Sequence, residues 1–127
     1  MDLFETFDTG SVTIAGKRTD IGRLAWNPHK EFPGVFLKNL VTADQTDRRF
    51  TCHLVRIEPG HAIGMHTHPA SVELHEVVRG SGLCLTEQGE IPYVPGVMAL
   101  LACSAPHEIR AGENGLCLFA KFVTAQA

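Results

Sequence analysis

Two histidines one residue apart, His66 and His68, restrict the local backbone more than any other feature of this 127-residue chain. Alternate side chains of a β-strand point to the same face, so both imidazoles can reach one point from a strand. On an α-helix the same spacing turns the two rings about 200° apart. Imidazole nitrogens bind divalent transition metals at about 2.1 Å. The pair therefore predicts both a strand and a metal site beside it.

The remaining sequence has the alternation and the turn residues of short β-strands, without the apolar stripe of a helix. Turn-forming pairs separate the candidate strands, as at Pro59-Gly60, Pro95-Gly96 and Asn114-Gly115. Many short strands at this spacing are typical of an all-β sandwich or barrel. We predict a short helix over residues 2–7 and strands over residues 11–15, 34–40, 49–57, 62–68, 73–79, 82–86, 91–94, 97–102, 107–110 and 116–123.

Composition and charge narrow the classes of partner. The net charge is −3 and the Lys and Arg residues are scattered, so we predict no nucleic-acid partner. The longest apolar run, residues 97–103, is too short to span a membrane, and residues 1–5 lack the features of a signal peptide. Four widely spaced cysteines without a Cys-x-x-Cys pair predict buried, reduced thiols. We therefore expect a cytoplasmic protein with no membrane partner.

Further residues stand at defined intervals around the two histidines. The pattern is Gly60, five residues, His66, one residue, His68, four residues, Glu73, six residues and Gly80. In every spaced position this pattern resembles the first motif of the cupin family.

A degenerate form of the second cupin motif follows along the chain. Its glycine and histidine positions are filled by Gly96 and His107. Other positions differ from the family, with Ala102, Ser104 and Ala111 in place of the usual proline, glycine and asparagine. Residues 104–106 can still turn before His107, because serine bonds to nearby backbone and proline fixes its φ angle.

The resemblance implies a jelly roll, that is, a double-stranded β-helix barrel. We expect one cupin domain over residues 1–127, with the metal-binding barrel at about 50–123 and extra N-terminal strands of residues 1–49 packing on it. The resemblance also implies a ligand set for one divalent metal ion per chain, formed by His66, His68, Glu73 and His107. Three nitrogens and one carboxylate oxygen suit Fe, Mn, Ni, Zn, Co or Cu, and affinity alone does not choose among them.

Two residues compete with Glu73 for the fourth ligand position. Glu76 would take it if the strand slipped its register, and His75 shares the face of Glu73 two residues on. We favour Glu73 as the ligand, with His75 behind it or in the pocket.

A second group of side chains is expected in the pocket. Alternation within residues 49–57 places His53 on the inward face with Val55 and Ile57. Pocket candidates are therefore His53 and His75, followed by Tyr93 and Cys103, whereas His29 and His61 are expected at the surface. The catalytic group itself is not identified.

Several functions fit such a site. We predict a metalloenzyme acting on a small organic substrate, namely a dioxygenase or a related oxidoreductase. Alternatives are a non-oxidative metal-dependent isomerase or lyase, a non-catalytic cupin that binds or senses a small ligand, and a purely structural cupin. Edge strands at residues 11–15 or 34–40 need cover, so we expect a homodimer.

Overall fold

The computed structural model describes residues 1–124. Its helical elements are α1 (Leu3–Asp8) and two 3-10 turns, η1 (Ile21–Arg23) and η2 (Ala43–Thr46). Its strands are β1 (Ser11–Ile14), β2 (Lys17–Asp20), β3 (Asn27–Pro28), β4 (Val35–Val41), β5 (Phe50–Ile57), β6 (Ala62–His66), β7 (Ser71–Thr86), β8 (Gly89–Tyr93), β9 (Met98–Leu101) and β10 (His107–Thr124). Apart from these short helical elements, the described residues form an all-β structure, as the sequence predicts.

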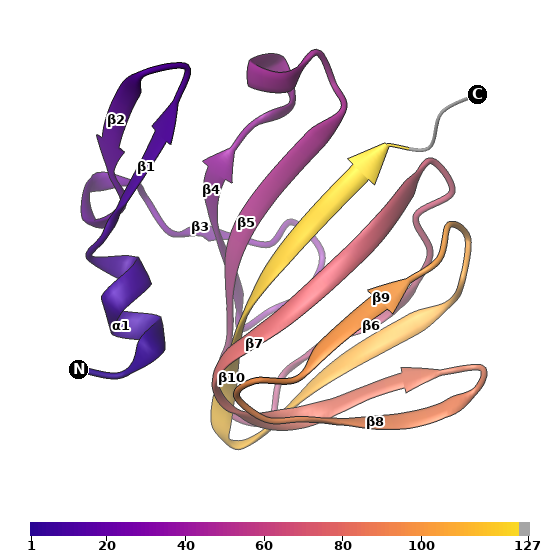
Figure 1. The fold of residues 1–127 in the computed structure, drawn as a ribbon. Coiled ribbons are helices and arrows are strands. Elements are labelled where there is room, and N and C mark those ends of the chain that lie inside the picture. Colours follow the sequence, from indigo (N-terminus) through magenta and orange to yellow (C-terminus); the bar gives the residue numbers. More distant parts are fainter. Residues whose placement is uncertain (125–127) are drawn as a thin grey trace.

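The strands form one small ribbon and one large antiparallel sheet. The ribbon is β1 paired with β2, and the large sheet has the order β3-β4-β5-β10-β7-β8. In addition, β6 pairs with β10 and β9 pairs with β7, so these two long strands serve both layers. The sheet curves back on itself to make the jelly roll, with α1 and the β1–β2 ribbon on one side (Figure 1).

The two long strands correct the predicted boundaries. The strands predicted over 73–79 and 82–86 are one strand, β7, and those over 107–110 and 116–123 are one strand, β10. Gly80 does not end the first of these strands but bends it. Its φ is +81°, and a Cβ placed there would lie 2.1 Å from the Gly115 carbonyl oxygen. Glycine therefore lets two bent backbones touch where the β7–β10 pairing shifts its register, between the pairs Ala111–Gly82 and Leu116–Gly80.

Alternation along the strands divides the apolar residues between two cores. On β5, Val55 and Ile57 belong to the inner core, inside the curved sheet, and Cys52 and Leu54 belong to the outer core. Each such fully buried side chain contributes about 1.5–3 kcal/mol relative to exposure. His53 is two residues before Val55 and therefore points to the same inward face, as predicted.

The N-terminal segment covers the outer core. Phe4 and Ile21 pack into it, and the Phe7 ring meets the Phe119 ring edge-on at 4.8 Å. On β7, the Arg79 guanidinium holds α1 through the carboxylates of Asp2 and Glu5, at 2.6 and 2.9 Å. The helix thus lies against the face of the sheet opposite the inner core, which leaves the interior for a site.

Two further expectations concern thiols and membranes. Cys52, Cys84 and Cys117 are buried, Cys103 is partly exposed, and all four are free. No helix within residues 1–124 is long and apolar enough to cross a bilayer.

Candidate metal centre

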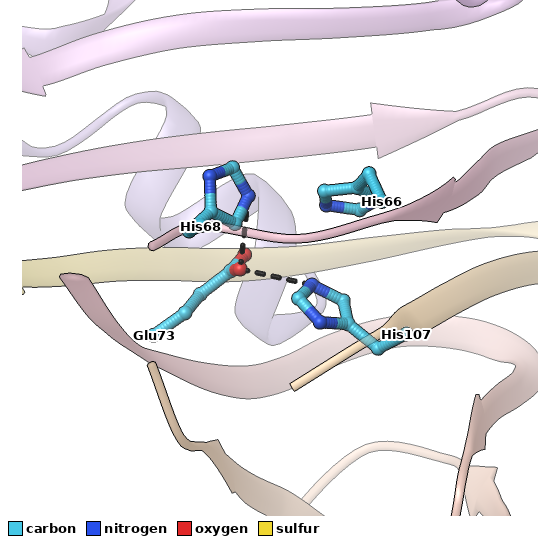
Figure 2. A group of neighbouring side chains, drawn as sticks. All are labelled: His66, His68, Glu73 and His107. Carbon is cyan, nitrogen blue, oxygen red and sulfur yellow. Dashed lines mark hydrogen bonds and ion pairs between the residues drawn. The ribbon is translucent and has the colours of Figure 1, made fainter. Parts of the chain in front are cut away.

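Four side chains of the kinds that bind metal ions converge inside the curved sheet. His66 ends β6, His68 follows it by two residues, Glu73 lies on β7, and His107 begins β10. Each offers one nitrogen or oxygen atom, and these atoms all lie within 4.8 Å of one another. Figure 2 shows the three imidazoles and the carboxylate turned toward a common point. The structure therefore brings together the four residues that the sequence pattern selects.

Strand pairing places two of the imidazoles. His66 is directly opposite His107 in the antiparallel β6–β10 ladder, and their ring centroids are 4.3 Å apart. The predicted strand over 62–68 ends at His66 instead, because β10 begins at His107 and offers no backbone partner beyond it. His68 still turns inward from the following loop, with its ring 4.8 Å from that of His66.

Backbone carbonyls fix the orientation of two histidine rings. The Nδ1–H of His66 donates to the Gly64 oxygen at 2.7 Å, and that of His107 donates to the Ala105 oxygen at 3.0 Å. When the proton is held on Nδ1, Nε2 is the ring nitrogen whose lone pair can bind a metal. Both rings are therefore oriented for ligation, but His107 Nε2 also donates to Glu73 Oε1 at 3.1 Å and would have to lose that proton to bind an ion.

The carboxylate of Glu73 is anchored through a buried chain of hydrogen bonds. Its Oε2 accepts from His75 Nε2 at 2.6 Å, and His75 Nδ1 accepts from the Tyr93 hydroxyl at 2.7 Å. An ionised carboxylate only accepts, which assigns the direction of both bonds. Burial raises the pKa of Tyr93, so its hydroxyl keeps the proton. Oε1 is thereby left to face the three imidazoles.

The distances between donor atoms fit a transition-metal ion. Glu73 Oε1 lies 3.1 Å from His107 Nε2 and 3.4 Å from His68 Nε2. With metal–ligand bonds of about 2.1 Å, neighbouring ligand atoms at right angles are about 3.0 Å apart and opposite ones about 4.2 Å. The observed spacings require only small side-chain rotations. The donor set, three imidazoles and one carboxylate, is also chemically suited to these ions.

Protons and a metal would compete for the same lone pairs. Burial alone would raise the pKa of Glu73, but hydrogen bonds from His107 and His75 outweigh it and hold that pKa well below its usual range. Burial lowers the pKa of His66 and of His68. Burial alone would lower the pKa of His107. The hydrogen bond from His107 to Glu73 outweighs this effect, so the pKa of His107 is raised. Metal binding at His107 would therefore release a proton.

We expect Tyr93→Phe to weaken metal affinity by about 10- to 100-fold, in the range seen for residues that orient metal ligands. Phenylalanine fills the same buried volume but cannot donate to His75, so Glu73 loses its fixed orientation. Competition with a chelator of known affinity measures the change. The matched control is Thr13→Val, which removes an exposed hydroxyl on β1. An unchanged affinity with normal thermal unfolding would show that Tyr93 only fills space.

A cavity of about 200 Å³ opens beside the donor atoms. Its walls are mainly apolar, formed by Leu37, Val55, Ile63, Leu118, Ala120 and Phe122. His53 also lines it, as predicted, and its ring meets Phe122 edge-on at 5.7 Å. The Phe122 ring in turn lies 5.0 Å from that of His68. The cavity thus offers an apolar chamber whose wall includes three histidines outside the donor set, namely His29, His53 and His75.

The other predicted residues take different places relative to the cavity. Glu76 points to the opposite face of β7 and pairs with Lys121 at 2.6 Å, so it does not compete with Glu73. His75 bonds to Glu73 and also lines the cavity, as predicted, whereas Tyr93 bonds to His75 and is not among the lining residues. Cys103 is not among the residues that line this cavity within the described chain.

His29 corrects the expectation of a surface residue. It is half-buried and lines the cavity, whereas His61 is exposed as expected. Its place depends on how the loop between β3 and β4 folds back against β6, and no local sequence signal carries that information.

Comparison with known proteins supports the fold. The chain matches no protein-family model, and no curated protein matches it. Solved structures do match. A predicted oxalate decarboxylase from Thermotoga maritima has 16% identity and a TM-score of 0.75 over 82% of this chain and 96% of its own.

Two further structures agree over most of the chain. The polyketide cyclase RemF from Streptomyces resistomycificus has 18% identity and a TM-score of 0.75, covering 87% of this chain and 80% of its own. A sugar phosphate isomerase of the cupin superfamily from Silicibacter pomeroyi has 21% identity and a TM-score of 0.70, covering 87% and 76%. The fold and the donor cluster together define a small protein with a jelly-roll fold and a candidate metal centre. The chain has the cupin jelly-roll fold, as the motif over residues 60–80 predicts.

Proposed function

We propose that this protein is a metalloenzyme in which His66, His68, Glu73 and His107 hold one divalent transition-metal ion. The observation that carries the proposal is the convergence of three imidazoles and one carboxylate, within 4.8 Å of one another, beside an apolar cavity. A purely structural role would not need rings oriented by backbone carbonyls toward a shared point.

The metal would supply Lewis-acid chemistry, since a divalent ion polarises a carbonyl and lowers the pKa of a bound hydroxyl. The chain supplies the rest. The apolar walls exclude water from the substrate, which strengthens charge interactions inside the cavity. Tyr93 and His75 hold Glu73 still, so the donor atoms do not have to reorganise during the reaction.

His53 is our candidate for proton transfer. Its Nδ1 donates to Asn39 Oδ1 at 2.8 Å, which leaves Nε2 as the accepting atom, 3.2 Å from the Thr51 hydroxyl. Burial lowers the pKa of His53, so the ring is neutral at neutral pH and able to take a proton. In our proposal Nε2 removes a proton from substrate carbon, the electron pair stays on the substrate, and the same nitrogen returns the proton to a neighbouring atom.

This arrangement favours a non-oxidative reaction, that of an isomerase or lyase. A neutral histidine with an orienting partner is what proton transfer needs, and an oxygenase does not require it. The names of the similar structures, a predicted decarboxylase, a cyclase and an isomerase, support the same direction.

A dioxygenase or related oxidoreductase is the second candidate. Its support is the number of ligands, because four protein donors on a six-coordinate ion leave two positions for dioxygen and substrate. A non-catalytic binding or sensing cupin is the third candidate, since the same site would hold a ligand without reaction.

Solvent exchange separates these candidates. We expect metal-loaded protein in D₂O to speed deuterium incorporation into at least one of acetylacetone, hydroxyacetone and 2-oxohexanoate, followed by proton NMR. His53→Gln should lower that rate by about 10²- to 10⁴-fold with metal content unchanged. Oxygen uptake with these compounds, without exchange, would favour the dioxygenase. Full metal loading with neither reaction would count against an enzyme.

A further inference from the structure

His29 stands at the mouth of the cavity. Together with Leu37 it lines both the 200 Å³ cavity beside the metal donors and an outer cleft of about 680 Å³. A small molecule moving from that cleft to the donor atoms would pass these two side chains.

The imidazole of His29 is held in one orientation. Its Nδ1 accepts hydrogen bonds from the backbone N–H groups of Glu31 and Phe32, at 3.0 and 3.3 Å. The ring packs on that of Phe32 at 4.9 Å, and Phe32 lies 6.3 Å from the ring of His66. An Nδ1 that accepts puts the proton of the neutral ring on Nε2. Within residues 1–124 this Nε2–H has no hydrogen-bond partner.

The charges around the cavity favour an anion at the metal. Among the described lining residues only Glu73 is an acidic or permanently charged side chain. A divalent ion beside one carboxylate and neutral imidazoles leaves one net positive charge in an apolar surrounding. A single negative charge on the ligand would neutralise it, whereas a second would be left without a partner.

The size and the walls limit the rest of the ligand. Pockets for drug-sized molecules are about 300–1,000 Å³, and this cavity is about 200 Å³. The side chains of Val55, Ile63 and Leu118 line the cavity and offer no hydrogen bonds, so the body of the ligand should be apolar.

We propose that His29 is a specificity-determining residue whose Nε2–H donates to the end of the substrate farthest from the metal. The substrate class is a small organic monoanion with an oxygen-chelating group at one end, an apolar body, and an uncharged carbonyl or hydroxyl at the other. This inference rests on the proposed function, because the chelating end needs the metal.

Two compounds that differ by one distant carbonyl test the inference. Protein loaded with Co(II) is titrated by calorimetry with 2-oxohexanoate and with 2,5-dioxohexanoate. We expect the dioxo compound to bind about 5- to 10-fold more tightly, as one added hydrogen bond allows.

The informative variant is His29→Asn. The Asn oxygen can still accept from the Glu31 and Phe32 N–H groups, but asparagine lacks the Nε2–H donor. We expect this variant to bind both compounds equally, while His61→Asn, at an exposed histidine outside the cavity, keeps the wild-type preference.

The outcomes distinguish the two proposals. Cobalt content below about a tenth of an equivalent in wild type would reject the metal site itself. Full cobalt content with the same preference in His29→Asn as in wild type would reject only the role of His29. Full content with no binding of either compound would reject the substrate class.

Discussion

Replacing His107 by alanine is expected to reduce bound metal from about one equivalent per chain to below about a tenth, and His66→Ala should do the same. The two rings face each other across the β6–β10 ladder, and each is oriented by a backbone carbonyl. Losing either imidazole leaves only three donors, and the donor that is lost is one whose ring already points toward the other three. Metal analysis after reconstitution with each of Fe, Mn, Ni, Co, Cu and Zn, followed by desalting, measures the effect.

Folding must be separated from ligation in this experiment. His107 is 1% exposed, so alanine there also leaves a space in the interior. His107→Gln restores much of the volume without an imidazole and should still lack metal. His61→Ala, at an exposed histidine, should keep the full equivalent. Retention of a full equivalent by folded His107→Ala would remove this residue from the site.

Gly80→Ala is expected to lower the free energy of unfolding by at least about 3 kcal/mol, or to prevent folding. The residue has φ +81°, and a Cβ would lie 2.1 Å from the Gly115 carbonyl oxygen, where only backbone could move. Both strands that bend here contribute to the metal centre, Glu73 from β7 and His107 from β10. Urea unfolding followed by fluorescence or circular dichroism measures the loss.

The chain contains a matched control for backbone strain. Gly16 has the same φ, +81°, but nothing lies within 4 Å of the position that a Cβ would take there. Gly16→Ala should therefore cost only about 1–2 kcal/mol, the penalty for a left-handed alanine. Equal losses for the two variants would show that the close approach at Gly80 relaxes easily.

The sequence carries much of this site because strand periodicity is local. The parity of β5 turns His53 inward, and the parity of β7 separates inward Glu73 from outward Glu76. When inward-facing residues on different strands are to meet at one point, the sheet that carries those strands has to be closed or strongly curved. His107 is predicted from the cupin resemblance alone, because it is too far along the chain for strand periodicity to relate it to the other three residues.

What local patterns miss depends on distant contacts. The glycines of β7 and β10 look like turns in sequence, yet each strand continues through them and the two strands pair again after a register shift between Ala111 and Leu116. The two-residue β3 has too little sequence to alternate, and His29 reaches the cavity only through its loop. The homodimer and the cytoplasmic location stay predictions, although β9 does expose Met98 and Leu100 on its outer side.

The central place of β10 has a consequence for how the protein is made. It pairs with β5, β6 and β7, and it is the last of the described strands to leave the ribosome. Until it arrives, the earlier strands lack their common neighbour and the fourth donor of the metal centre. A nascent chain stalled before residue 107 should therefore have little capacity to capture an ion, so metal insertion would follow translation rather than guide it.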